Sequence, residues 1–357
     1  MKIIQIIHKP QHRGAEVFAS QLSGHLVSLG HQVKVVSVYE GKADLPFDGK
    51  ITSLEASPSK RFFDLAAWKR LNKIIREFEP DVVQANAGDT LKYAVFSKII
   101  FNWKVPIFSR NASEIGRYLT NSIQKNLNSF LYKRVDRVIS VSKASENDIL
   151  EHFPFLEGRT EVIPVGLERI KIPRDVVLEP GNKKHIVHVG GFTFEKNHKG
   201  LIEIILKVLK KHPNVFLHLL GDGPLKKEVE EQVKENNLSQ YVKFYGFVNN
   251  PLSYIRGADV LVLPSIIEGL PGVLLEAMYC KIPVVAYNVG GISEIVNENT
   301  GFLIEKDRKE LFATAILEIL EKENDLMIKT AYKIVSEQYM NDRITEQFVR
   351  CYSRFLD

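Results

Sequence analysis

The stretch from Val260 to Met278 reads Val-Leu-Val-Leu-Pro-Ser-Ile-Ile-Glu-Gly-Leu-Pro-Gly-Val-Leu-Leu-Glu-Ala-Met. Its first four residues form an uninterrupted apolar run, which is typical of a strand buried on both faces. A turn containing glycine and proline follows, and then a segment that predicts a helix. A buried strand that leads through a short loop into a helix is the repeating unit of a parallel α/β sheet.

The same pattern extends in both directions from this stretch. In the first half the strand-like runs are Ile3–Ile7, Val33–Val38, Val82–Gln84, Ile107–Ser109, Val138–Val141 and Val162–Ile163. In the second half they are Ile186–Val189, Val215–Leu220, Val242–Tyr245, Val260–Leu263, Val284–Ala286 and Gly301–Leu303. Amphipathic segments lie between the runs. We therefore expect the α/β class, with two doubly wound parallel-sheet domains.

The length of 357 residues fits about two domains at ~150 residues each. Proline, glycine and polar residues accumulate over Pro164–Asn182, which predicts a linker. We expect an N-terminal domain over 1–170 and a C-terminal domain over 183–338. A last helix over 339–357 can either cap the second domain or pack back on the first.

Composition excludes several protein classes. Hydrophobic residues make up 45% and charged residues 25%, as in ordinary globular proteins. The two cysteines, Cys280 and Cys351, form no CxxC pair, so neither a zinc site nor a disulfide framework is indicated. The apolar start Ile3–Ile7 is interrupted by Gln5 and is too short for a signal peptide. We expect a cytoplasmic protein, at most peripheral to the inner face of the membrane.

The first half of the chain is mildly basic. Residues 1–170 hold 24 Lys and Arg against 18 Asp and Glu, whereas residues 171–357 hold 24 against 25. This balance favours anionic partners such as phosphates, but it is too weak to indicate nucleic-acid binding. Residues Arg117–Arg137 read as a basic amphipathic helix. We favour an ordinary surface helix there over one that rests on an anionic membrane.

Two strand-to-helix loops are suited to anions, because ligands of open α/β sheets bind beyond the carboxyl ends of the strands. Gly14 lies at the start of a helix after the first strand. In the second domain Gly190 and Gly191 precede Lys196 and Lys199. Neither loop has a Walker A ending or a GxGxxG fingerprint, which argues against a P-loop NTPase and a nicotinamide dehydrogenase. For both loops an ordinary structural turn or helix start is the alternative.

Glu268 and Glu276 carry the strongest functional signal. One carboxylate precedes a helix and the other lies within it, and both are predicted to face the strand ends. Ionised carboxylates only accept hydrogen bonds, so such a pair suits a ligand rich in hydroxyl groups. Helix capping and interaction with the helix dipole are the structural alternative.

These residues resemble a known family. Glu268-x7-Glu276, followed by Pro283–Ala286 and Gly290–Val296, is similar to the motif of the retaining glycosyltransferases of family 4. The resemblance implies their GT-B fold, in which two doubly wound, Rossmann-like parallel-sheet domains face each other across a cleft. The resemblance covers nearly the whole chain. Its further segments are Arg13–Glu16, Asp136–Ser142, Val162–Gly166, Val187–Gly200, Leu219–Lys226, Phe244–Val248 and Gly301–Leu303.

The resemblance implies roles for individual residues. The second domain would bind a nucleoside diphosphate sugar as substrate, and the first would bind an acceptor. Glu276 would bind the ribose, Glu268 the donor sugar and Lys196 the diphosphate. Backbone groups would come from Gly14, Gly269, Leu270, Pro271 and Gly272, and the backbone of Phe247 and Val248 would meet the base. The resemblance implies no cofactor and no metal, because lysine and N–H groups stabilise the leaving diphosphate.

The chain departs from the family pattern at three places. Gly191 stands where the family usually has an arginine for the diphosphate, and Lys199 is our candidate to replace it. Asn111 stands where a histidine is frequent, and Arg13 replaces one glycine of a pair. Asn111 can hydrogen-bond a sugar or acceptor but cannot act as an acid or base. We place Glu268, Lys196 and Asn111 in the catalytic role, and Arg110, Asn111 and Glu114 on the acceptor side.

The sequence therefore predicts a retaining, metal-independent hexosyltransferase acting in cell-surface polysaccharide synthesis. The expected partners are a nucleotide-sugar donor, with UDP preferred over GDP, and a glycan or lipid-linked acceptor. No nucleic acid is expected, and a peripheral membrane contact stays open. The alternatives are a nucleotide-sugar epimerase or phosphorylase of the same fold, or a catalytically weak nucleotide-sugar-binding protein.

Overall fold

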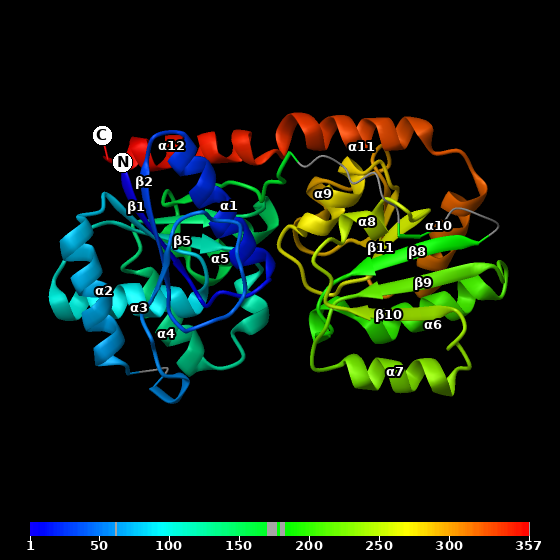
Figure 1. Cartoon of the computed structure of the whole chain (residues 1–357), viewed down its shortest axis with the longest axis horizontal. Helices are drawn as coiled ribbons and strands as arrows, with labels where there is room; N and C mark the ends of the chain where they lie inside the picture. The colour runs from blue at the N-terminus through cyan, green and yellow to red at the C-terminus, as the bar shows by residue number, and fades with distance from the viewer. Residues whose placement is uncertain (61–62, 170–176, 179–182, 357) are drawn as a thin grey trace. The chain divides into compact units, whose positions relative to one another are not determined.

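The computed structural model describes residues 1–60, 63–169, 177–178 and 183–356 (Figure 1). The chain divides into two compact units. Unit 1 comprises Met1–Glu168 and Asn341–Asp357, and unit 2 comprises Arg169–Met340. Within the predicted linker Pro164–Asn182, residues 170–176 and 179–182 lie outside the described residues.

Unit 1 is built on a seven-stranded parallel sheet with the order β3-β2-β1-β4-β5-β6-β7. Its strands are β1 (Lys2–Ile7), β2 (Gln32–Ser37), β3 (Ile51–Ser53), β4 (Val82–Ala85), β5 (Ile107–Asn111), β6 (Arg137–Ser140) and β7 (Thr160–Val162). Its α-helices are α1 (Gly14–Ser28), α2 (Leu65–Phe78), α3 (Gly88–Phe101), α4 (Ser122–Tyr132), α5 (Lys143–His152) and α12 (Asn341–Leu356). Short 3₁₀ turns are η1 (Pro58–Lys60), η2 (Ile115–Tyr118) and η3 (Pro154–Leu156).

Helices cover both faces of this sheet. Residues of α2, α3, α4 and α5 form one buried cluster with the side chains of Ile4 and Ile6. Residues of α1 and α12 form a second cluster with Ile3, on the opposite face. Because side chains alternate across a strand, β1 is apolar on both faces, which explains its near-continuous apolar run.

The C-terminal helix α12 is part of unit 1 and packs on α1 (Figure 1). Its fully buried Tyr352 donates a hydrogen bond from its hydroxyl to Gln84 Oε1 and accepts one from Gln5 Nε2 at 3.4 Å. Asn86 links both glutamines: its Nδ2 donates to Gln5 Oε1 and its Oδ1 accepts from Gln84 Nε2, each at 2.9 Å. The sequence left the position of this helix open.

Unit 2 is built on a six-stranded parallel sheet with the order β10-β9-β8-β11-β12-β13. Its strands are β8 (Lys184–Val189), β9 (Val215–Leu220), β10 (Val242–Gly246), β11 (Val260–Leu263), β12 (Val284–Tyr287) and β13 (Phe302–Ile304). Its α-helices are α6 (His198–Leu209), α7 (Lys226–Glu235), α8 (Leu252–Ile255), α9 (Gly272–Tyr279), α10 (Lys309–Glu321) and α11 (Asp325–Gln338), and its 3₁₀ turns are η4 (Phe194–Lys196) and η5 (Gly290–Glu294). Helix α6 packs against α7 and α10, whereas α9 packs against α8 and α11.

The predicted α/β class with two doubly wound parallel sheets is confirmed. The sequence prediction missed β3, which has only three residues and is half-buried throughout. The helix predicted over Arg117–Arg137 is wrong: the structure has η2, then α4, then the start of β6 at Arg137. Asn121 explains the break, because its side chain accepts a hydrogen bond from the Gln124 N–H and so caps a new helix start.

Candidate functional site

In unit 2 the strand order reverses between β8 and β11, which both lie at the centre of the sheet. Their pairing is confined to Val260 with Ile186 and Leu261 with Val187. Beyond these pairs the two strands continue into loops at the carboxyl edge of the sheet. Ligands of open α/β sheets bind at such a switch point.

The two loops bring Lys196 and Glu268 together. Lys196 Nζ lies 2.5 Å from Glu268 Oε1, and the two side chains are 23% and 10% exposed. The sequence placed a cation in one loop and a carboxylate in the other, 72 residues apart. The structure brings this cation and this carboxylate into direct contact at the point where the fold favours ligand binding.

Backbone and side-chain hydrogen bonds fix the two loops to each other. Asn197 adopts a left-handed conformation, with φ of 53°, and its side chain accepts a hydrogen bond from the Gly200 N–H at the start of α6. The same side chain donates to Pro264 O at 3.0 Å, and Ile266 N donates to Glu195 O at 2.8 Å. Lys196 is therefore held in a rigid turn rather than on a free surface.

The helix α9 presents its N-terminus at the same edge. Its N-cap residue Pro271 has no side chain that can accept a hydrogen bond, and no atom lies within 4 Å of a Cβ placed on Gly272. The first N–H groups of a helix have no partner within the helix, so they are available to an anion. Gly269 and Leu270 precede this turn, and the Gly269 carbonyl accepts a hydrogen bond from Gly291 N at 2.7 Å.

The backbone of Gly290 packs closely against the backbone of Glu268. Gly290 has φ of +55°, and a Cβ placed on it would lie 2.0 Å from the Glu268 carbonyl oxygen. Only glycine fits both the space and the conformation. The loop after β12 therefore fixes the backbone that carries the Glu268 side chain.

Glu276 is half-buried on α9 and has no side-chain hydrogen bond among the residues that the structure describes. Burial raises the pKa of its carboxyl group to about 7. A carboxyl group in this environment gains from a ligand that donates hydrogen bonds to it.

Polar side chains beneath the two loops were not identified as a cluster from the sequence. His188, His198 and Ser265 are buried, and His188 Nε2, both ring nitrogens of His198 and Ser265 Oγ have no partner in the described structure. Burial is the main cause that lowers the pKa of His188 to about 4 and that of His198 to about 2. The ring of His198 stacks on that of Phe192, with 3.9 Å between the ring centroids.

Four other predicted donor-binding residues take no part in the Lys196–Glu268 contact, namely Lys199, Gly191, Phe247 and Val248. Lys199 Nζ pairs with Glu228 Oε2 of α7 at 2.6 Å, on an exposed surface. Gly191 is open enough for a side chain, because the nearest atom to a Cβ there would be Asp222 O at 3.5 Å. Phe247, at 52% exposed, and Val248 follow directly after β10.

In unit 1 the strand order reverses between β1 and β4, and Gly14 is the first residue of α1, directly beyond β1. No atom lies within 4 Å of a Cβ placed on Gly14, and the N-cap residue Arg13 makes no side-chain cap. This helix start therefore matches that of α9 in its open, uncapped geometry.

Arg110 and Asn111 are neighbours on β5 but contact different elements. The Arg110 guanidinium lies 4.0 Å from the Phe18 ring of α1, and its three buried nitrogens have no partner in the described structure. Asn111 Nδ2 donates to Ser145 O of α5 at 3.0 Å and to Ser140 Oγ at 3.3 Å. Glu114 lies in the following loop and pairs with Arg117 at 3.6 Å. The structure therefore separates Arg110 from Asn111 and does not bring the three together.

Family models match both units. Residues 12–169 match the model described as Glycosyltransferase Family 4, and residues 170–334 match the model described as Glycosyl transferases group 1. The chain belongs to the family 4 glycosyltransferases. Anabaena HepE in complex with UDP-glucose superimposes with a TM-score of 0.84 at 20% identity, over 99% of this chain and 100% of that chain. This likeness shows that the glycosyltransferase has the GT-B fold.

Two curated relatives add to the comparison. One is N-acetylgalactosamine-N,N'-diacetylbacillosaminyl-diphospho-undecaprenol 4-alpha-N-acetylgalactosaminyltransferase of Campylobacter jejuni, 29% identical over 60% of each chain. The other is the O-antigen biosynthesis glycosyltransferase WbnH of Escherichia coli, 27% identical over 78% of this chain and 80% of the relative. Within the described residues of this glycosyltransferase, none of the helices has the length and apolarity needed to cross a membrane.

Proposed function

We propose that this glycosyltransferase moves a hexose, with retention of configuration, from a nucleoside diphosphate sugar to a hydroxyl group. UDP is the preferred nucleotide and GDP the second choice. The acceptor is a glycan or a lipid-linked saccharide in cell-surface polysaccharide synthesis. The nucleotide sugar is the substrate, and the reaction needs no cofactor or metal.

The contact between Lys196 and Glu268 is the observation that carries this proposal. The ammonium group suits the leaving diphosphate, because a fixed positive charge in a partly buried site stabilises developing negative charge. The uncapped start of α9 adds N–H groups at the same edge. The carboxylates of Glu268 and Glu276 accept hydrogen bonds from sugar and ribose hydroxyl groups. Together these groups serve every part of a nucleotide sugar except its base.

On the acceptor side, Arg110 supports the proposal more directly than Asn111 does. The buried Arg110 guanidinium has donors without a partner, and a buried unpaired charge costs several kcal/mol unless a ligand, water or counter-ion compensates it. The Asn111 amide is already engaged with α5. We propose that Arg110 and Glu114 each contribute to binding the acceptor and that Asn111 holds α5 in place.

The relatives support the acceptor class. The Campylobacter relative is named for a diphospho-undecaprenol acceptor, and the Escherichia coli relative for O-antigen biosynthesis. HepE was solved with UDP-glucose, which supports UDP as the first nucleotide to try.

Calorimetric titration with UDP, GDP and NAD in the absence of metal tests the donor site. The expected result is micromolar binding of UDP or GDP, no binding of NAD, and loss of the diphosphate binding in Glu276→Ala. Unchanged binding in Glu276→Ala would refute the assignment of that residue. Binding without transfer to any acceptor would favour the weak binding protein, and isomerised or released sugar would favour the epimerase or phosphorylase.

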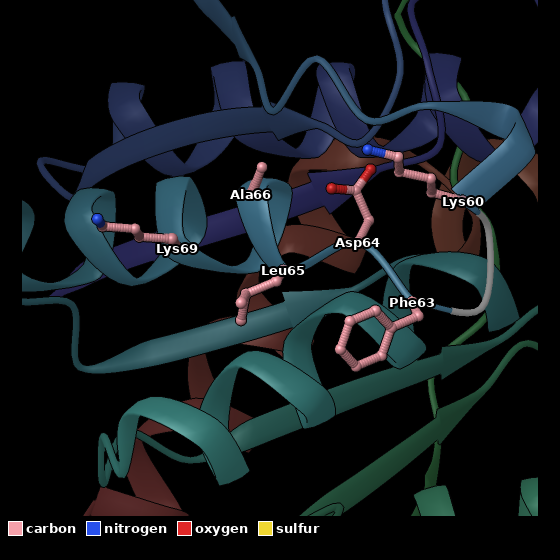
Figure 2. A pocket seen from close by; sticks show the side chains of 6 residues that line it. All are labelled: Lys60, Phe63, Asp64, Leu65, Ala66 and Lys69. Carbon is pink, nitrogen blue, oxygen red and sulfur yellow. The ribbon is translucent and has the colours of Figure 1, made fainter.

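A peripheral membrane contact is the remaining part of the proposal. Lys60, Phe63, Asp64, Leu65, Ala66 and Lys69 line a hollow of about 490 Å³ at the start of α2. Figure 2 shows the side chains of Phe63 and Leu65 on the same side of the chain, away from the Asp64 carboxylate. Phe63 and Leu65 are 68% and 47% exposed, and lysines flank them. Exposed apolar side chains beside basic groups favour an anionic bilayer surface.

Flotation with vesicles that contain 30% phosphatidylglycerol tests this contact. We expect the wild-type protein to float and Phe63→Ser with Leu65→Ser to stay at the bottom of the gradient. Equal flotation of the wild type and the double variant would contradict the contact at this hollow.

A further inference from the structure

At the ends of β9 and β10 the sequence predicts only backbone contacts to the base, from Phe247 and Val248, and no side chain has a role there. These ends are continuous with the end of β8. Gly221 N donates to Gly246 O at 2.8 Å, and a Cβ placed on Gly221 would lie 2.0 Å from Gly190 O. The carboxyl ends of β8, β9 and β10 therefore form one glycine-lined edge.

The opposite direction along the sheet is closed. The turn η5 after β12 packs on the Glu268 loop, through the hydrogen bond from Gly291 to Gly269 and through the backbone contact of Gly290. A nucleotide with its diphosphate at Lys196 must therefore extend over β9 and β10. At ~4.8 Å between neighbouring strands, β10 lies about 10 Å from β8, a distance that a ribose and a base span.

Lys226 lies beside the end of β10, where a nucleotide that extends from β8 over β9 would place its base. It is the first residue of α7, and its Nζ would lie 3.8 Å from a Cβ placed on Gly246. Lys226 is half-buried and has no hydrogen-bond or ion-pair partner for its side chain within the described ranges. Lys196 and Lys199, in contrast, are both paired with carboxylates.

We propose that Lys226 reads the nucleotide base and restricts the donor to bases with a keto oxygen at this edge. A lysine ammonium has three hydrogen-bond donors and no acceptor. It can donate to O4 of uracil or O6 of guanine, whereas cytosine and adenine present an amino group in the same place. The inference rests on the proposed function, since it assumes a nucleoside diphosphate at Lys196.

Calorimetric titration with UDP, GDP, CDP and ADP tests this role in the wild type and in three variants. Lys226→Met keeps the length of the side chain and removes its donors. Lys226→Arg restores a donor-only cation, and Lys227→Met is the matched control, because Lys227 is the next residue of α7 and is exposed.

The wild type is expected to bind UDP or GDP at least tenfold more tightly than CDP and ADP. Lys226→Met is expected to weaken binding of the preferred nucleotide about tenfold, which is typical of a lost charge-assisted hydrogen bond, and to leave CDP unchanged. Lys226→Arg should keep the selectivity, and Lys227→Met should bind as the wild type does.

Three results would overturn the proposal. They are equal weakening of UDP and CDP by Lys226→Met, no change in any affinity, or a wild-type preference for CDP or ADP. If the wild type binds none of the four nucleotides, the proposed function itself fails, and this inference fails with it. Selective binding that is unaffected by Lys226→Met refutes only the role of Lys226.

Discussion

Replacing Glu268 by glutamine should have opposite effects on nucleotide binding and on sugar transfer. In the ligand-free structure Glu268 holds Lys196 at 2.5 Å, and a diphosphate must compete with this carboxylate for the same ammonium group. Glu268→Gln removes the competing charge and the repulsion between the carboxylate and the phosphates. The donor sugar, however, loses its charged hydrogen-bond acceptor.

The burial of the pair sets the size of the effect. With side chains 23% and 10% exposed, the pair lies between a surface ion pair, worth up to about 1 kcal/mol, and a buried one worth several. If Glu268→Gln removes a cost of about 1.4 kcal/mol for breaking this pair, UDP binds about tenfold more tightly. The loss of a charge-assisted hydrogen bond to the sugar costs about 1.5–3 kcal/mol, so transfer should fall at least tenfold.

Calorimetry with UDP and a UDP-release assay with UDP-sugar measure the two effects. Glu203→Gln is the matched control, because it frees Lys309 from an exposed pair of similar length, 2.6 Å, without touching Lys196. We expect its UDP affinity to stay within about twofold of the wild type. Unchanged or weaker UDP binding in Glu268→Gln would refute the reasoning, and so would equal tightening in Glu203→Gln.

Three further variants probe the fold around the sites. Glu276→Gln should raise the melting temperature at pH 8 but not below pH 4.5. The pKa of the folded carboxyl group is raised from 4.5 to about 7, so the stability that Glu276 contributes at low pH is lost, by about 3 kcal/mol, as pH rises through 7. Equal shifts in melting temperature at pH 4 and pH 8 would contradict this. Gly290→Ala should destabilise unit 2 by about 1–3 kcal/mol in urea, because φ is +55° and the Glu268 carbonyl occupies the space; a neutral effect would show that the loop can move. Tyr352→Phe should cost about 1–3 kcal/mol in the same assay, because it leaves Gln84 Oε1 buried without its donor, and a wild-type transition would argue against the network.

The sheet topology and the proximity of the Lys196 and Glu268 loops can be predicted from the sequence. Both loops follow apolar runs, and the switch-point rule places loops after neighbouring strands at one edge. The rule does not give side-chain directions. Lys199 turns to Glu228 of α7, and Lys226 is the first residue of the same helix, where the sequence predicted no role for its side chain.

Contacts between distant segments limited the prediction in unit 1. Arg110 and Asn111 are adjacent in sequence, and the period-two alternation of a strand already separates such neighbours to opposite faces. What the sequence could not show is that α12 returns to this sheet and that Asn111 is engaged by α5. These partners lie far apart in the sequence, so no local sequence pattern predicts their contacts.

The anomeric form of the first product tests the central claim most directly. The protein is incubated with UDP-glucose, which is α-linked, and with simple glycoside acceptors, and early product is followed by proton NMR. We expect UDP release with an α-linked or α-anomeric product, and loss of this activity in a folded Lys196→Met variant. A β-configured product, or equal activity in Lys196→Met, would contradict it.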